Sequence, residues 1–93
     1  MTRTEALGVV IREARKRLNI SQEKLAESAK LHRNALGRIE RSEVGLNLST
    51  LWLIADAMEI TASELVQKAE ILATTKENQA LTVLPSRRGD NAP

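Results

Sequence analysis

Between Ser21 and Arg41 the chain reads SQEKLAESAKLHRNALGRIER, a pattern typical of two short helices in close succession. Ser21 is a favoured N-cap residue, and it predicts a helix over Gln22–Ala29. A second helix is expected over Arg33–Arg41. Because only Lys30–His32 connects them, the two helices must meet at a sharp angle, and the second can project from the body of the domain.

The outer side of that second helix carries residues suited to the edges of DNA bases. Leu36 and Ile39 are expected to face the core, which leaves Arg33, Asn34, Gly37 and Arg38 on the outside. Arginine donates a fork of two hydrogen bonds to guanine, and asparagine pairs with adenine. Glycine costs about 1 kcal/mol of helix propensity relative to alanine, and a bare backbone there can approach DNA closely. The pattern favours a base-reading surface; a solvated polar face that tolerates a glycine is the alternative.

The segment before these two helices has apolar residues at spacings of four, three and four, which predicts a helix over Thr4–Leu18. Leu18 is expected on its buried stripe. Thr2 together with Glu5, or Thr4 alone, can cap its start.

The segment after them begins with a loop over Ser42–Leu46, in which Gly45 is able to adopt a positive φ angle. Asn47 then predicts the start of a fourth helix. Its apolar residues recur at helical spacing, and the expected buried side begins at Leu48.

Thr61 and Glu64 form a T-x-x-E capping box that predicts a fifth helix, whose periodicity fades after about Thr75. We therefore expect an all-α fold: a compact five-helix bundle over residues 1–75, followed by a short C-terminal tail over residues 76–93. The tail contains an apolar group, Leu81–Leu84, which is either a dimerisation arm or an unstructured end.

Composition narrows the classes of function. With one tryptophan and no phenylalanine or tyrosine, the core must be aliphatic, which favours packed helices over a sheet. The absence of cysteine and the single histidine, His32, argue against disulfides and against a metal site. No titratable groups converge as catalysis requires, so we expect no catalytic residues and no cofactor. The apolar runs are short and no signal peptide is evident, which indicates a soluble cytoplasmic protein without a membrane partner.

Charge is distributed unevenly along the chain. Residues 1–45 carry ten Lys/Arg against six Asp/Glu, a net +4, whereas residues 46–93 carry four against six, a net −2. A basic first half suits attraction to a polyanion, although ordinary surface variation would also produce this imbalance.

From Leu7 to about Leu65 the chain resembles the helix-turn-helix domain of the phage repressor and Cro family, the XRE-type regulators. The matching motifs are Leu7-Gly8, Ile11-Arg12, Arg15, Ile20-Ser21-Gln22-Glu23-Lys24-Leu25-Ala26, Ile39-Glu40-Arg41, Leu48, Thr50-Leu51, Ile54-Ala55, Ala57-Met58, Ile60 and Leu65. This resemblance implies a lambda repressor-like fold and a transcription regulator that binds a symmetric double-stranded DNA operator as a homodimer.

The resemblance also implies roles for single residues. Gln22 would bind a phosphate and brace the first residue of the recognition helix, and Arg15 with Glu40 would form a largely buried structural ion pair. The base-reading positions are Arg33, Asn34 and Arg38. Further phosphate contacts are implied at Arg41, Ser42 and Asn47.

Two residues depart from the family pattern at the entry to the recognition helix. Lys30 stands where the turn usually holds a small residue or glycine, so either its backbone is strained or the turn differs. His32 stands where serine or threonine usually caps the helix. It can bind a phosphate or simply face solvent.

Three large apolar residues are expected outside the core and are candidates for a dimer interface: Trp52, Leu53 and Ile71. Trp52 can alternatively just cover the edge of the domain. A competing function is an antitoxin or another protein-interaction module that keeps the helix-turn-helix fold. Besides DNA and a second copy of the chain, RNA polymerase or a toxin is a candidate protein partner.

Overall fold

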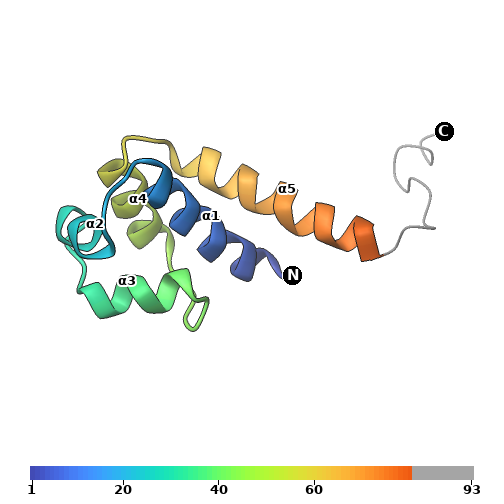
Figure 1. The fold of residues 1–93 in the computed structure, drawn as a ribbon, viewed down its shortest axis with the longest axis horizontal. Coiled ribbons are helices and arrows are strands. Elements are labelled where there is room, and N and C mark those ends of the chain that lie inside the picture. Colours follow the sequence, from blue (N-terminus) through green and yellow to red (C-terminus); the bar gives the residue numbers. More distant parts are fainter. Residues whose placement is uncertain (81–93) are drawn as a thin grey trace.

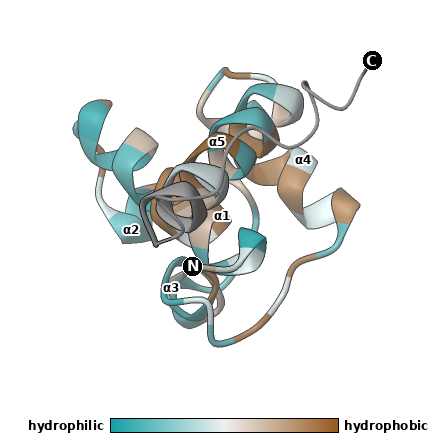
Figure 2. Ribbon diagram, turned by 90° about the vertical axis from the view of Figure 1, so that its right-hand side faces the viewer, coloured by the Kyte–Doolittle hydropathy of each residue, from teal (hydrophilic) through white to brown (hydrophobic). Residues whose placement is uncertain are grey.

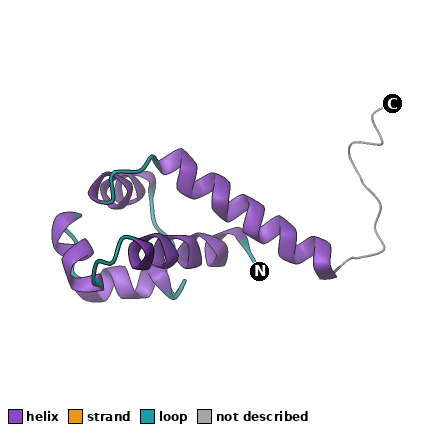
Figure 3. Cartoon of the chain, turned by 45° about the horizontal axis from the view of Figure 1, so that its top comes forward, coloured by secondary structure: helices purple, strands orange, loops and turns teal. Residues whose placement is uncertain are grey.

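The computed structural model describes residues 1–80 and contains five helices in that part of the chain (Figures 1 and 3). They are α1 (Arg3–Arg17), α2 (Gln22–Ser28), α3 (Arg33–Glu40), α4 (Leu48–Ala57) and α5 (Ala62–Ala80). The predicted all-α bundle is confirmed, and each predicted helix is found. None of the described helices is long and apolar enough to cross a membrane.

The N-terminal ends of the helices follow the capping residues seen in the sequence. Thr2 and Glu5 form a reciprocal capping box at α1. The side chains of Ser21 and Asn47 accept hydrogen bonds from backbone N–H groups in the first turns of α2 and α4, at 3.0 and 2.8 Å. Each bond satisfies one of the N–H groups that a helix leaves unpaired at its start.

At α5 only half of the predicted capping box is present. The Thr61 hydroxyl accepts a hydrogen bond from the Glu64 N–H at 3.1 Å. The Glu64 carboxylate does not return to the Thr61 backbone but pairs with Lys68 one turn later, at 3.3 Å. An i,i+4 Glu–Lys pair competes with the reciprocal bond of the box.

The C-terminal ends of α1 to α4 all use the same turn, and each contains a non-glycine residue with a positive φ of 61–63°. These residues are Asn19, Lys30, Ser42 and Glu59. In each turn the next residue donates its N–H to a carbonyl five positions earlier, which is the Schellman pattern. Lys30 therefore does take the strained conformation that the sequence suggested. Gly45 does not use its freedom to adopt a positive φ: no glycine within residues 1–80 has one, and Ser42 makes the turn instead.

The centre of the core receives one large, fully buried side chain from every helix. These are Ile11, Leu25, Leu36, Ile54 and Leu65. Burying a side chain of this size stabilises the fold by about 1.5–3 kcal/mol. Since α5 packs mainly along α1, and α3 packs on α1 and α2, the core fixes α3 at one edge of the domain (Figure 1).

Two leucines expected in the core are exposed. Leu18, at the C-cap of α1, is 48% exposed, and Leu48, the first residue of α4, is 63% exposed. Both lie at a helix end, beyond the turns that neighbouring helices cover. Periodicity alone does not reveal where that cover stops.

Helix α5 runs to Ala80, five residues beyond the point at which its periodicity fades. The division of the chain at residue 75 stays a prediction. The apolar group Leu81–Leu84 lies outside the described residues.

Candidate nucleic-acid interface

Helix α3 separates its residues sharply into a buried side and an exposed side. Leu36 and Ile39 are buried against the core. Arg33, Asn34 and Arg38 are exposed. In Figure 1 no other described helix crosses in front of α3. In Figure 2 α2 and α3 are largely hydrophilic, whereas α4 is mostly hydrophobic. The structure thus brings the three predicted base-reading side chains together on one open face.

Gly37, the fourth residue predicted for this face, is buried. A β-carbon at Gly37 would lie 3.1 Å from Arg41 Nη1 and 3.3 Å from Gln22 Oε1. The Gln22 side chain crosses α3 at this point, so glycine makes room for a protein side chain. Gly37 is therefore not on the exposed side where the sequence predicted it, and a contact of its backbone with DNA stays a prediction.

The orientation of α3 relative to α1 is held by the predicted ion pair between Arg15 of α1 and Glu40 in the last turn of α3. Arg15 Nε donates to Glu40 Oε2 at 2.8 Å, and Arg15 Nη2 donates to Glu40 Oε1 at 3.0 Å. Arg15 Nη1 also donates to the Ile20 carbonyl at 3.0 Å. Only 8% of Arg15 and 6% of Glu40 is exposed. This hydrogen-bonded carboxylate raises the pKa of Arg15 above its ordinary value, so the guanidinium stays charged.

Gln22 joins the same network from the start of α2. Its Nε2 donates to Glu40 Oε1 at 3.0 Å. The amide therefore braces the last turn of α3, whereas the family resemblance implied a brace to Arg33 in the first turn. Glu40 thus ties α1, α2 and α3 together through three hydrogen bonds. Among the described side chains, no buried nitrogen or oxygen atom is without a hydrogen-bond partner.

The start of α3 differs from the starts of the other helices. His32 occupies the N-cap position, but its side chain makes no capping hydrogen bond, and it is exposed. Backbone N–H groups in the first turn of a helix favour anions. A side-chain cap would occupy one of these N–H groups, and His32 provides no such cap. The predicted contact of His32 with phosphate is not tested by this geometry.

At the C-terminal end of α3, three charged side chains form a cluster that the sequence does not predict. Arg41 Nε donates to Glu43 Oε2 at 2.8 Å, and Arg41 Nη2 donates to Glu43 Oε1 at 3.3 Å. Arg38 Nε lies 3.9 Å from the same Oε1. Two of the predicted DNA contacts therefore share one carboxylate. Its signal in the sequence is an acidic residue five positions after Arg38, in the segment predicted only as a loop.

Two residues predicted to contact phosphate have other hydrogen bonds in the structure. The Ser42 hydroxyl lies 3.3 Å from the Thr4 carbonyl and 3.5 Å from the Glu5 carbonyl, where it joins α3 to α1. A phosphate only accepts hydrogen bonds, so Ser42 would have to give up this contact to donate to one. Asn47 uses its side-chain oxygen as the cap of α4 and keeps its NH₂ group for donation.

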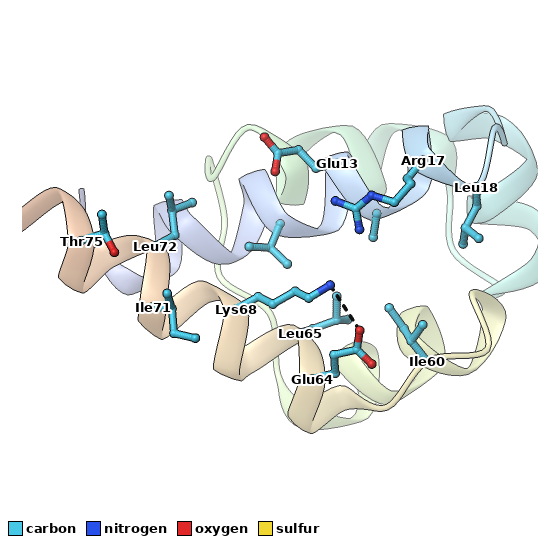
Figure 4. Close-up of a pocket in the computed structure, with 12 residues that line it drawn as sticks. Glu13, Arg17, Leu18, Ile60, Glu64, Leu65, Lys68, Ile71, Leu72 and Thr75 are labelled. Carbon is cyan, nitrogen blue, oxygen red and sulfur yellow. Dashed lines mark ion pairs between the residues drawn. The ribbon is translucent and has the colours of Figure 1, made fainter.

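The three candidate interface residues are exposed as expected: Trp52 is 54%, Leu53 41% and Ile71 57% exposed. Ile71 lines an apolar groove of about 460 Å³ between α1 and α5 (Figure 4). Trp52 and Leu53 belong to α4 and do not line this groove. The structure therefore offers two separate apolar surfaces instead of one.

Comparison with known proteins matches the helical framework described above. Residues 11–65 match the family model described as helix-turn-helix. The control protein C.SmaI of Serratia marcescens is 39% identical over 64 residues, which cover 69% of this chain and 76% of C.SmaI. The immunity repressor protein of Bacillus phage phi105 is 38% identical over 74 residues, which cover 80% of this chain and 49% of that repressor.

Among solved structures, the restriction-modification controller protein C.Esp1396I bound to a 25 base pair operator site is similar with a TM-score of 0.68. It is 26% identical to this chain, and the match covers 76% of this chain and 97% of C.Esp1396I. The sharply angled pair α2–α3, the shared core and these matches lead to one conclusion: the chain belongs to the helix-turn-helix family of phage repressor and Cro type.

Proposed function

We propose that this protein is a sequence-specific transcription regulator that binds double-stranded DNA with α3 in the major groove. The observation that carries the proposal is the open face of Arg33, Asn34 and Arg38 on a helix whose opposite side is fixed by the core and by Glu40. A rigid support matters, because base reading requires side chains held in one register against the DNA.

The chemistry of this face fits the edges of base pairs. Arg33 and Arg38 can each donate two hydrogen bonds to guanine, and Asn34 can pair with adenine, each worth about 1–3 kcal/mol of discrimination. Gly37 is covered by Gln22 and drops out of the reading set. Around the face, the proposed phosphate contacts are Gln22, His32, Arg41 and Asn47. The engaged hydroxyl of Ser42 is the weakest candidate for such a contact.

A homodimer is proposed because a single helix contacts too few base pairs to select a site. A single helix contacts only a few base pairs, and proteins of this class gain specificity by placing two helices on half-sites about one helical turn apart. The operator site of 25 base pairs to which C.Esp1396I is bound is longer than a single helix can contact, which supports a dimer here. Such a regulator acts in the cytoplasm, where its DNA lies. RNA polymerase or a toxin, the protein partners predicted from sequence, would bind a surface other than α3.

The two apolar surfaces give a direct test of the dimer. If α4 supplies the interface, Trp52→Ala yields monomers in sedimentation velocity. If the groove between α1 and α5 supplies it, Ile71→Asp does so. A dimer that survives both substitutions places the interface elsewhere.

The function itself is tested by selecting bound sequences from a library of random duplexes. We expect one enriched motif with two-fold symmetry that contains both G·C and A·T pairs at fixed positions in each half-site. Affinity for the selected site should fall steeply with salt, because each phosphate contact releases counterions. A library from which nothing is enriched, together with no binding to any duplex at low salt, would remove the DNA-binding function.

A further inference from the structure

The charged cluster at the end of α3 has a negative member, Glu43, on the surface that should attract DNA. Its carboxylate accepts a fork of two hydrogen bonds from Arg41, at 2.8 and 3.3 Å. One of its two oxygens also lies 3.9 Å from Arg38 Nε. All three side chains are about half exposed, so the cluster lies on the open surface.

The backbone fixes Glu43 in this position. Ser42 has a φ of 61°, and the Glu43 N–H donates to the Arg38 carbonyl at 2.8 Å. In the equivalent turns after α1, α2 and α4 this position is held by an apolar, partly buried residue that packs on the core. Those residues are Ile20, Leu31 and Ile60. The turn after α3 uses the same geometry to hold a carboxylate beside two arginines.

The two arginines stabilise the ionised form of Glu43 at a helix end that disfavours negative charge. The C-terminal end of a helix carries partial negative charge and disfavours a carboxylate. The hydrogen bonds from Arg41, with the charges of Arg41 and Arg38, nevertheless hold the pKa of Glu43 below its ordinary value. The carboxylate is therefore negative at neutral pH, and Glu43 reduces the charge of the cluster from +2 to +1.

A DNA phosphate and this carboxylate make the same demand on Arg41. Both accept a planar fork from a guanidinium, so a phosphate can bind Arg41 only by displacing Glu43 or by sharing the arginine against its negative charge. Arg38 is held more loosely, at 3.9 Å, and can leave for a base without breaking the fork on Arg41. Non-operator DNA, which binds through its phosphates alone, is therefore repelled by the Glu43 carboxylate. On the operator, a hydrogen bond from Arg38 to the correct base can offset this repulsion.

We propose that Glu43 is a specificity-determining residue that competes with DNA phosphate for Arg41 and Arg38 and so weakens binding to non-operator DNA. This inference rests on the proposed function. It extends that function by assigning part of the discrimination between operator and non-operator DNA to a residue that does not have to contact a base.

The test compares wild-type protein with Glu43→Gln on two duplexes of equal length, one carrying the selected operator and one with the same bases scrambled. Affinities are measured over a series of salt concentrations. Glutamine keeps the size of the side chain and the N–H that closes the turn. Glu59→Gln is the matched control, since it removes the same charge from an exposed position in the turn between α4 and α5.

We expect Glu43→Gln to bind the scrambled duplex about three- to fivefold more tightly at low salt, the upper part of the range for one exposed ion pair. The slope of log affinity against log salt should steepen by about 0.9, equivalent to one more phosphate contact. Operator affinity should change less, so that the ratio of operator to scrambled affinity falls. Glu59→Gln should match the wild type in all three quantities.

Two results would overturn the proposal. If Glu43→Gln leaves scrambled-duplex affinity and the salt slope unchanged, Glu43 does not compete with phosphate. If it weakens both duplexes equally, Glu43 only positions Arg41. Failure of the wild type to bind any duplex is a different outcome, since it removes the proposed function together with the inference that rests on it.

Discussion

Replacing Glu40 with alanine should destabilise the domain by about 3–5 kcal/mol, the usual cost of removing one partner of a buried ion pair. The substitution removes two hydrogen bonds from Arg15 and one from Gln22. Arg15, only 8% exposed, would keep a single bond, to the Ile20 carbonyl. The cost is the buried, unpaired charge that remains.

The expected loss is large for a domain of this size. Total stabilities are about 5–15 kcal/mol, and in a domain of 60–100 residues each 1 kcal/mol lowers Tm by about 4–8 °C. Glu40→Ala should therefore lower Tm by at least about 12 °C. Urea unfolding followed by circular dichroism measures the loss directly, as a lower midpoint at unchanged slope.

Two further variants separate the charge from the packing. Glu27→Ala removes an exposed carboxylate whose pair with Lys24 spans 4.0 Å, and it should cost less than about 1 kcal/mol. The double variant Arg15→Met with Glu40→Leu removes both charges, and it should recover most of the loss. A cost below about 1 kcal/mol for Glu40→Ala, or a double variant no more stable than the single one, would refute this account of the pair.

Three other perturbations follow from the geometry. Gly8→Ala should lower the free energy of unfolding in urea by about 1–3 kcal/mol. Its β-carbon would lie 2.7–2.8 Å from three atoms at the end of α3, two of them backbone carbonyl oxygens. The control Gly45→Ala should lower it little, because nothing lies within 4 Å of a β-carbon there. Lys30→Gly should raise Tm, since glycine adopts the observed φ of 61° without the penalty of about 1–2 kcal/mol for an L-residue; a lowered Tm would contradict this. Arg41 lowers the pKa of Glu43, so the ion pair stabilises the fold above the ordinary pKa of 4.5, and this stabilisation is lost as the pH falls through the lower pKa of the folded state. NMR titration should place the Glu43 midpoint below 4.5, and Arg41→Gln should raise that midpoint.

The starts of the helices could be predicted from sequence because capping is local. Thr2, Ser21 and Asn47 each act within three residues of their own position. The ends of the helices were harder to predict. Helices α1 to α4 are each followed by a non-glycine residue whose left-handed conformation is offset by hydrogen bonds and, in most cases, by burial of the following side chain. That offset depends on tertiary packing.

In the candidate site, too, local features could be predicted from the sequence and features that depend on tertiary packing could not. The open face of Arg33, Asn34 and Arg38 follows from helical periodicity, because the buried side is fixed by apolar residues. The cover over Gly37 does not, since it depends on the path of the Gln22 side chain from another helix to Glu40. Glu43 was missed for a similar reason: its pairing with Arg38 and Arg41 requires the turn that Ser42 makes.

The most direct test of α3 as the DNA-reading helix is the operator affinity of Arg38→Ala, compared with Lys16→Ala at an exposed lysine in the last turn of α1. We expect Arg38→Ala to keep the wild-type circular dichroism spectrum and Tm. It should bind the operator about 10- to 100-fold more weakly, with a much smaller loss on a scrambled duplex. Lys16→Ala should lose little on either. Wild-type operator affinity in folded Arg38→Ala would contradict the central role of this face.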